Sequence, residues 1–157
     1  MAPPLIGELL SLFKRDKNVL LDKLKVTEEQ LKWVADKSED QRKIHYWGMY
    51  RRLRLTASNF GIVLKAVTRQ EATGRPYPPS LFKALKGEYN LEKKDPIIRG
   101  KMHGDEALKQ YKEKTGNTVL PSGLYLFPCG YLGCSPDGII TNTLYGDSIG
   151  ALERKCP

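Results

Sequence analysis

Two short stretches near the C-terminal end decide the fold: GCSPDG at residues 133–138 and LERKCP at residues 152–157. The first predicts a turn leading into a strand, because proline presets the second turn position and glycine closes the turn at the fourth. The second follows Gly146 and Gly150 and predicts a short buried strand. If the two strands are neighbours, their charged side chains gather at one place on a sheet.

Three of these side chains can act together. Side chains alternate between the faces of a strand, so Glu153 and Lys155 point the same way and Arg154 points the opposite way. On neighbouring strands, Asp137 joins Glu153 and Lys155 on one side of the sheet. Two carboxylates suit a hard divalent cation, and a lysine beside them orients or deprotonates a water or stabilises developing phosphate charge. The pattern predicts metal-assisted phosphodiester hydrolysis.

A simpler interpretation explains the same residues. Ser-Pro-Asp-Gly is an ordinary turn sequence, and an acidic residue two positions before a lysine is common on exposed strands. The placement favours a site, because Glu153 and Lys155 lie in an otherwise apolar segment bounded by glycines. Unpaired charge is costly to bury there, and such local conflict marks functional sites more often than decoration.

The composition describes a globular chain without a membrane span. With 157 residues, 40% apolar and 28% charged, it is expected to fold as one domain with a substantial core. No apolar run approaches the length of a transmembrane helix. The N-terminal residues lack the basic start, apolar stretch and cleavage site of a secretory signal. We expect a protein that is not secreted.

Charge and cysteine content narrow the partners. Twenty-six Lys and Arg against eighteen Asp and Glu give a net charge of +8, which favours a polyanionic partner, nucleic acid first and an anionic membrane surface second. The three cysteines form no Cys-x-x-Cys pair and only two histidines are present. Zinc and disulfide frameworks are therefore disfavoured, and an intracellular compartment, cytoplasm or nucleus, is expected.

The first third of the chain predicts helices. Apolar spacing over residues 5–24 indicates one or two amphipathic helices. The sequence TEEQ at residues 27–30 is a capping-box pattern that starts a helix extending to about Tyr50, with the charged segment 36–40 as its weak point. Residues 1–45 are expected to form an N-terminal helical extension.

The most basic stretch of the chain occupies residues 47–58. Thr56 or Ser58 is a natural N-cap for the helix that follows. Exposed backbone N–H groups at a helix N-terminus, with hydroxyls and arginines nearby, make a ready anion site. The arginines of this stretch are candidates for DNA contact, although a solvated face is the simpler explanation of such a run; they are Arg51, Arg52 and Arg54.

The following region predicts loops and one short helix. Residues 69–80 have the composition of a loop, a short helix is expected at about 80–86, and a second loop runs through Pro96. Four residues of this region are candidates for lining a DNA channel: Arg75, Tyr77, Lys83 and Lys86.

Taken together, these motifs resemble the phage lambda-type exonucleases, the YqaJ viral recombinase family of the PD-(D/E)xK nuclease superfamily. The resemblance rests on the two C-terminal motifs and on the spacing Trp-x3-Arg-x4-Thr-Ala-Ser that starts at Trp47, and it covers roughly residues 47–157. It implies that Arg51, Ser58 and Ser135 hold the 5′-phosphate of DNA. It also implies that Asp137 and Glu153 ligate metal with the Arg154 carbonyl, and that Lys155 acts on the water.

The resemblance implies a fold and an activity. It implies an α+β protein with a restriction-endonuclease-like core, a central mixed sheet flanked by helices, over residues 46–157. It implies a Mg²⁺- or Mn²⁺-dependent exonuclease that degrades linear duplex DNA ends 5′→3′ to serve recombination. Its implied partners are DNA, further copies of the chain in a ring-shaped homotrimer, and a single-strand annealing protein.

One helix departs from the family pattern. Residues 105–112 predict a helix that Gly116 stops. The family carries a metal-binding glutamate near the start of this helix. Matching Ala107 and Tyr111 to the family pattern places Gly104 at the position of that glutamate. Asp105 or Glu106 would have to substitute, and Glu106 is the predicted metal ligand. Strands are expected at 118–120, 124–127 and 139–141, which gives a core order of helix and then strands ending in Glu-x-Lys.

Alternatives stay open at this point. Related domains continue beyond the Glu-x-Lys motif, so the chain is expected to be truncated. The rival enzyme is a PD-(D/E)xK endonuclease that cuts internally with the same residues. A catalytically degenerate DNA-binding module would bind with strong salt dependence and without hydrolysis. In a purely structural basic domain, Glu153 and Lys155 would form an ordinary surface pair.

Overall fold

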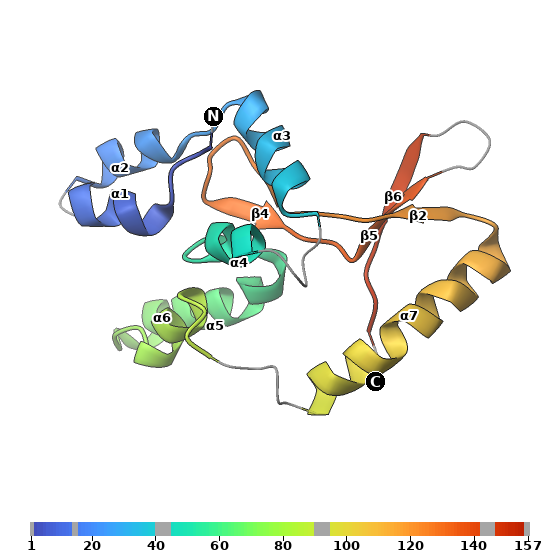
Figure 1. Ribbon diagram of the computed structural model, residues 1–157. Coiled ribbons are helices and arrows are strands. Elements are labelled where there is room, and N and C mark those ends of the chain that lie inside the picture. The colour runs from blue at the N-terminus through green and yellow to red at the C-terminus, as the bar shows by residue number, and fades with distance from the viewer. Residues whose placement is uncertain (1, 14–15, 40–44, 90–94, 142–146, 156–157) are drawn as a thin grey trace. The chain divides into compact units, whose positions relative to one another are not determined.

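The computed structural model shows an α+β protein, as predicted (Figure 1). It describes residues 2–13, 16–39, 45–89, 95–141 and 147–155. The described strands form two three-stranded sheets, whereas a single central sheet was expected. The chain divides into two compact units: unit 1 is Met1–Tyr89 with Gly123–Ser135, and unit 2 is Asn90–Ser122 with Pro136–Pro157.

The elements divide between the units as follows. Unit 1 contains the helices α1 (Ile6–Phe13), α2 (Lys17–Leu24), α3 (Glu28–Lys37), α4 (His45–Arg51), α5 (Ala57–Thr73) and α6 (Pro79–Leu85), with the strands β1 (Leu55–Thr56), β3 (Tyr125–Leu126) and β4 (Leu132–Cys134). Unit 2 contains the helix α7 (Asp95–Thr115) and the strands β2 (Thr118–Leu120), β5 (Gly138–Thr141) and β6 (Ser148–Leu152).

The N-terminal residues form the two amphipathic helices that their spacing predicts, α1 and α2. Asp16 caps α2, because its carboxylate accepts hydrogen bonds from the backbone N–H groups of Asn18 and Val19. The apolar faces of both helices contribute to one buried cluster, formed by Ile6, Leu9 and Leu24 with Leu53 packed against it.

Helix α3 begins at the predicted capping box. The Thr27 hydroxyl accepts from the Gln30 N–H at 3.3 Å, and the Gln30 side chain accepts from the Thr27 N–H at 3.0 Å. The helix ends at Lys37 and does not extend to Tyr50. Residues 40–44 lie outside the described residues, and α4 follows them.

Buried Ser38 connects the end of α3 to the sheet of unit 1. Its hydroxyl donates to the Val34 carbonyl and accepts a hydrogen bond from the Leu124 N–H at 2.7 Å. Both neighbours belong to the core of the unit, which consists of Val34, Tyr50, Leu124 and Leu126. A satisfied hydroxyl thus fixes the segment that leads into β3 against α3.

The sheet of unit 1 is mixed, in the order β1-β4-β3. Strand β4 runs parallel to β1 and antiparallel to β3, with Gly133 opposite both Thr56 and Leu126. Strand β4 is not among the strands that the sequence predicts. A Cβ at Gly133 would stand 3.0 Å from the Tyr125 carbonyl, so this glycine serves a close strand contact there.

Helix α5 extends further than predicted. It continues through Thr73 and ends where Gly74 adopts a left-handed conformation with φ of 65°. The loop expected from Arg69 therefore begins after Gly74. Helix α6 lies within one residue of its predicted range, 80–86.

Unit 2 opens with one continuous helix. Helix α7 starts at Asp95, well before the predicted start at Asp105, and it holds Pro96 in its first turn, where a missing N–H costs nothing. It ends at Thr115, and Gly116 follows in the left-handed region as predicted. Gly104 and Glu106 therefore lie within the helix and not at its start.

The sheet of unit 2 is antiparallel, in the order β2-β5-β6. The two motif strands are neighbours, as expected, and the last residue pair is Gly138 opposite Leu152. A Cβ at Gly138 would lie 2.5 Å from Val119 Cγ1, which explains the glycine after Asp137.

The predicted buried strand over residues 152–157 is corrected. Strand β6 ends at Leu152, and the next residues, Glu153 and Lys155, are exposed. Gly146 and residues 156–157 lie outside the described residues. In the described part of the chain, no helix is long and apolar enough to cross a membrane.

Candidate functional site

The three residues predicted to hold a phosphate come from three elements of unit 1. Arg51 is the last residue of α4, Ser58 lies in the first turn of α5, and Ser135 directly follows β4. Parallel pairing sets Thr56 opposite Gly133. Ser58 and Ser135 each come two residues later, so both leave the same end of the sheet.

A tryptophan joins these residues into one group. The Arg51 guanidinium donates a hydrogen bond to the Ser58 hydroxyl and lies 4.2 Å from the centre of the Trp47 ring. The Trp47 indole N–H donates to the Ser135 hydroxyl at 2.7 Å. We call Trp47, Arg51, Ser58 and Ser135 the arginine–serine cluster.

The chemistry of the arginine–serine cluster is that of an anion site. It combines a guanidinium, two hydroxyls and the first turn of a 17-residue helix, where backbone N–H groups and the helix dipole favour negative charge. The Thr56 hydroxyl lies 3.1 Å from that of Ser58 and adds a further polar group. Such donors suit a phosphate group.

Sequence reasoning missed the role of Trp47, although it used the residue as part of a spacing. The signal was available: residues four apart on a helix share a face, so a tryptophan four before an arginine places the ring beside the guanidinium.

The two other arginines of the basic stretch differ from each other. Arg52 is exposed and lines a pocket of about 480 Å³ together with Leu53, Lys86, Gly87 and Glu88. Its predicted contact with DNA remains a proposal.

Arg54 is not a DNA contact, because its side chain is fully buried. Its guanidinium donates to the carbonyls of Gly130 at 2.7 Å, Tyr50 at 2.8 Å and Pro4 at 3.3 Å. Burial lowers the pKa of Arg54 to about 10, so the group stays charged at neutral pH. Arg54 fixes α4 to the N-terminal segment and to the turn before β4.

The predicted catalytic residues lie beside the start of β5 and the end of β6, in unit 2. Asp137 directly precedes β5, and its backbone N–H donates to the Leu152 carbonyl at 2.8 Å. One carboxylate oxygen of Asp137 accepts the backbone N–H of Arg154 at 2.7 Å. We call Asp137, Glu153, Arg154 and Lys155 the strand-end group.

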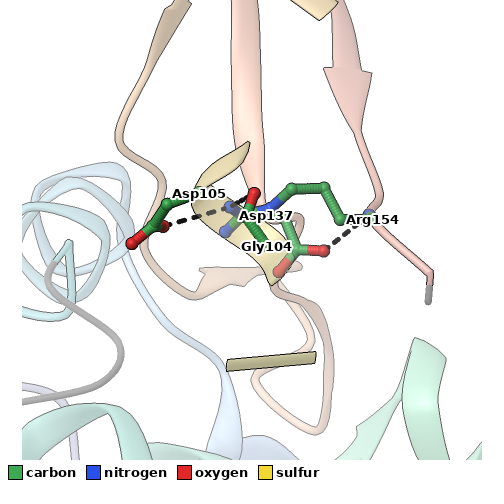
Figure 2. A network of polar contacts seen from close by, with 4 residues as sticks. All are labelled: Gly104, Asp105, Asp137 and Arg154. Carbon is green, nitrogen blue, oxygen red and sulfur yellow. Dashed lines mark hydrogen bonds and ion pairs between the residues drawn. The ribbon is translucent and has the colours of Figure 1, made fainter. Parts of the chain in front are cut away.

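Burial alternates along this segment, although it follows the end of β6. Glu153 and Lys155 are exposed, whereas the Arg154 side chain between them is only 17% exposed. Arg154 donates to the Gly104 carbonyl of α7 at 2.8 Å and lies 3.7 Å from an Asp105 carboxylate oxygen (Figure 2).

Glu106 is not brought to the strand-end group. Its carboxylate accepts a hydrogen bond from Gln110 at 3.0 Å on an exposed face of α7. At 3.6 residues per turn, two positions correspond to about 200° around a helix. Glu106 thus points almost opposite to Gly104, and Asp105 is the acidic residue of α7 that approaches Arg154. Among the described residues, no three His, Cys, Asp or Glu side chains are grouped closely enough to hold a metal ion.

Comparison of the sequence with protein families identifies the family of this chain. Residues 46–157 match the model of the YqaJ-like viral recombinase domain. The chain belongs to this family. No curated protein and no solved structure matches the chain. The YqaJ-like region extends over parts of both units and contains the arginine–serine cluster and the strand-end group.

Membership indicates the general activity and the type of substrate. The YqaJ-like viral recombinase domain is a nuclease domain of recombination, which acts on DNA. The nuclease resemblance seen in the sequence is confirmed at this level.

Proposed function

We propose that this YqaJ-like chain is a metal-dependent exonuclease that degrades linear duplex DNA from 5′-phosphorylated ends in the 5′→3′ direction. The observation that supports this most directly is the arginine–serine cluster, in which Arg51, Ser58 and Ser135 are linked through contacts with one another and with Trp47. A site for a terminal phosphate gives a reason to start at an end.

The cluster would hold the phosphate with little reordering of its own side chains. Arg51 is positioned by Trp47 and Ser58, so little side-chain entropy is lost when an anion replaces a hydroxyl partner. An arginine fork also matches phosphate oxygens better than a lysine does. Arg52 and Lys86, which line the pocket in the same unit, would contact the DNA backbone.

The strand-end group would hold the divalent cation. Asp137 and Glu153, with the backbone carbonyl of Arg154, are hard oxygen donors, and Mg²⁺ binds through one or two carboxylates while keeping several waters. The donor set therefore fits Mg²⁺ or Mn²⁺ completed by water. A bound cation would supply Lewis-acid stabilisation of the phosphoryl oxygens and a more acidic water.

Lys155 is the residue that would act on the nucleophile. Its side chain is exposed and follows Glu153 by two residues, on the opposite side of the chain from the partly buried Arg154. A lysine at this place orients the attacking water or removes its proton.

The chain connects the two groups closely in sequence. Ser135 closes unit 1 and Asp137 lies in unit 2, with only Pro136 between them. Proline fixes its own φ and restricts the residue before it.

The resemblance to lambda-type exonucleases adds a homotrimer and a single-strand annealing partner to this proposal.

One observation favours a second function, a DNA-binding module without hydrolysis. Gly104 supplies no carboxylate, and no group of three candidate metal ligands occurs in the described ranges. Such a module would bind DNA with steep salt dependence, because phosphate contacts release counterions.

Digestion of an end-labelled linear duplex with Mg²⁺ separates these functions. The exonuclease consumes a 5′-phosphorylated linear duplex, leaves closed circular DNA intact, and loses its activity in Lys155→Ala. Cleavage of the circle would identify an endonuclease. Salt-sensitive binding without cleavage of either substrate would identify the binding module.

A further inference from the structure

Arg154 is placed unlike its two neighbours. It lies between Glu153 and Lys155, yet its side chain is largely buried while theirs are exposed. Figure 2 shows this side chain extending from the end of β6 toward Gly104 and Asp105 on α7. The sequence assigns Arg154 only a backbone carbonyl in metal binding, which leaves its long cationic side chain unexplained.

The contacts of Arg154 tie together two elements of unit 2. At one end, its guanidinium donates to the Gly104 carbonyl at 2.8 Å. At the other end, its backbone N–H donates to the Asp137 carboxylate at 2.7 Å. A single residue therefore connects the carboxylate before β5, the chain after β6 and the middle of helix α7.

The bond to Gly104 is the stronger anchor of the side chain. Gly104 is buried, and a glycine lets a neighbouring group approach its backbone closely. The Asp105 contact is longer, at 3.7 Å, and the Asp105 side chain is 81% exposed. Exposed ion pairs at such distances contribute little.

We propose that Arg154 is a positioning residue for the strand-end group, an inference that rests on the proposed nuclease function. With its guanidinium fixed on α7, Arg154 holds its own backbone N–H against Asp137. Glu153 and Lys155 flank Arg154 in the chain and are exposed where it is partly buried, so fixing Arg154 also restricts the backbone that carries both. The carboxylates and the lysine would thus be oriented before the cation and DNA bind.

Two effects of Arg154 on metal affinity act in opposite directions, so the direction of the change on substitution distinguishes them. Arg154 adds a positive charge to the strand-end group, and this charge opposes binding of a cation, so a purely electrostatic role predicts tighter metal binding when Arg154 is removed. Positioning predicts the reverse. Arg154→Lys keeps the charge but lacks the planar fork that arginine uses for two-point contacts.

The first experiment is titration with Mn²⁺ alone, followed by electron paramagnetic resonance, on the whole chain. Positioning predicts about tenfold weaker binding in Arg154→Ala, the lower end of the effect of residues that orient metal ligands, and weaker binding in Arg154→Lys as well. Asp105→Asn, the matched control, should change the affinity by less than about twofold. Unchanged or tighter binding in Arg154→Ala overturns the inference.

The second experiment needs no metal. Amide hydrogen exchange at position 154, measured by NMR in metal-free protein, should become faster in Arg154→Ala than in the unaltered chain and in Asp105→Asn. Equal exchange in all three proteins overturns positioning of Asp137 by Arg154. If the unaltered chain binds no Mn²⁺, the proposed metal-dependent function fails, and the exchange rates still decide whether Arg154 positions Asp137.

Discussion

The arginine–serine cluster and the strand-end group are held by different kinds of contact. In the cluster, side chains contact side chains: Arg51 binds Ser58 and lies over Trp47, which binds Ser135. In the strand-end group, the two hydrogen bonds join side chains to backbone, from the Arg154 N–H to Asp137 and from the Arg154 guanidinium to the Gly104 carbonyl, and the side-chain contact of Arg154 with Asp105 is longer, at 3.7 Å.

This difference determines what a substitution can separate. Changing one member of the arginine–serine cluster also removes a partner from the others. In the strand-end group, an isosteric change of Asp137 removes charge and keeps an acceptor for the backbone N–H. Chemistry and geometry can thus be tested separately in unit 2, whereas in unit 1 they change together.

The largest effect is expected from Asp137→Asn. Loss of one carboxylate charge from the proposed metal site should slow cleavage of linear duplex by about 10³-fold, since metal stabilisation of the transition state is worth about 4 kcal/mol. Binding should still prefer a 5′-phosphorylated end over a 5′-hydroxyl end. Cleavage rates and fluorescence-anisotropy binding with both ends measure the two properties. Full activity in Asp137→Asn would remove this residue from the chemistry.

Arg51→Ala should give the opposite pattern. A charge-assisted hydrogen bond contributes about 1.5–3 kcal/mol, so the preference for a 5′-phosphorylated end should fall about 10- to 100-fold while Mn²⁺ affinity stays unchanged. Arg69→Ala is the matched control, because it removes the same charge from exposed α5 of the same unit. An equal loss of preference in both variants would show that only overall charge matters.

Arg54→Met tests a buried arginine near the cluster, and it should change the stability of unit 1. It leaves the Gly130 and Tyr50 carbonyls without their donor, and the free energy of unfolding should fall by about 3 kcal/mol in urea denaturation. Burial lowers the pKa of Arg54 to about 10 from its higher ordinary value, so the unfolded chain holds this proton more tightly. Its contribution to stability is therefore constant below pH 10 and rises only above it. A loss that changed between pH 6 and 8 would contradict this.

The sequence predicted local features of helices and strands well, but it predicted poorly where some of these elements end. The capping box at Thr27, the helix stop at Gly116 and the pairing of the motif strands all follow from residues that are close in sequence or alternate strictly. The end of β6 does not, because Leu152 is the last residue whose partner, Gly138, still belongs to β5.

Long-range contacts explain the wrong assignments of charged residues. Arg54 looks like its neighbours in a basic run, but the carbonyls that accept its hydrogen bonds belong to Gly130 and Pro4, far away in the chain. Glu106 looked close enough to replace a ligand at position 104, but α7 is continuous through this region and turns the two positions to opposite faces. Only the three-dimensional fold supplies these facts.

The smallest effect, and the finest test of the comparison, is expected from Trp47→Phe. Phenylalanine keeps an aromatic ring for the Arg51 guanidinium and removes only the indole N–H that donates to Ser135 at 2.7 Å. A neutral hydrogen bond contributes about 1 kcal/mol, so the preference for a 5′-phosphorylated end should fall about fivefold, less than in Arg51→Ala. Competition between the two ends for one protein sample resolves such a ratio.

The control for Trp47→Phe is Ser135→Ala, which removes the same hydrogen bond from the other side. If the bond positions the cluster, the double variant should lose little more than Ser135→Ala alone, since both substitutions delete the same hydrogen bond. Ser135 is also a proposed phosphate contact, so Ser135→Ala should lose more of the preference for a 5′-phosphorylated end than Trp47→Phe does. Additive losses would mean that Trp47 and Ser135 act independently, and the cluster would then be a set of separate contacts that happen to lie together.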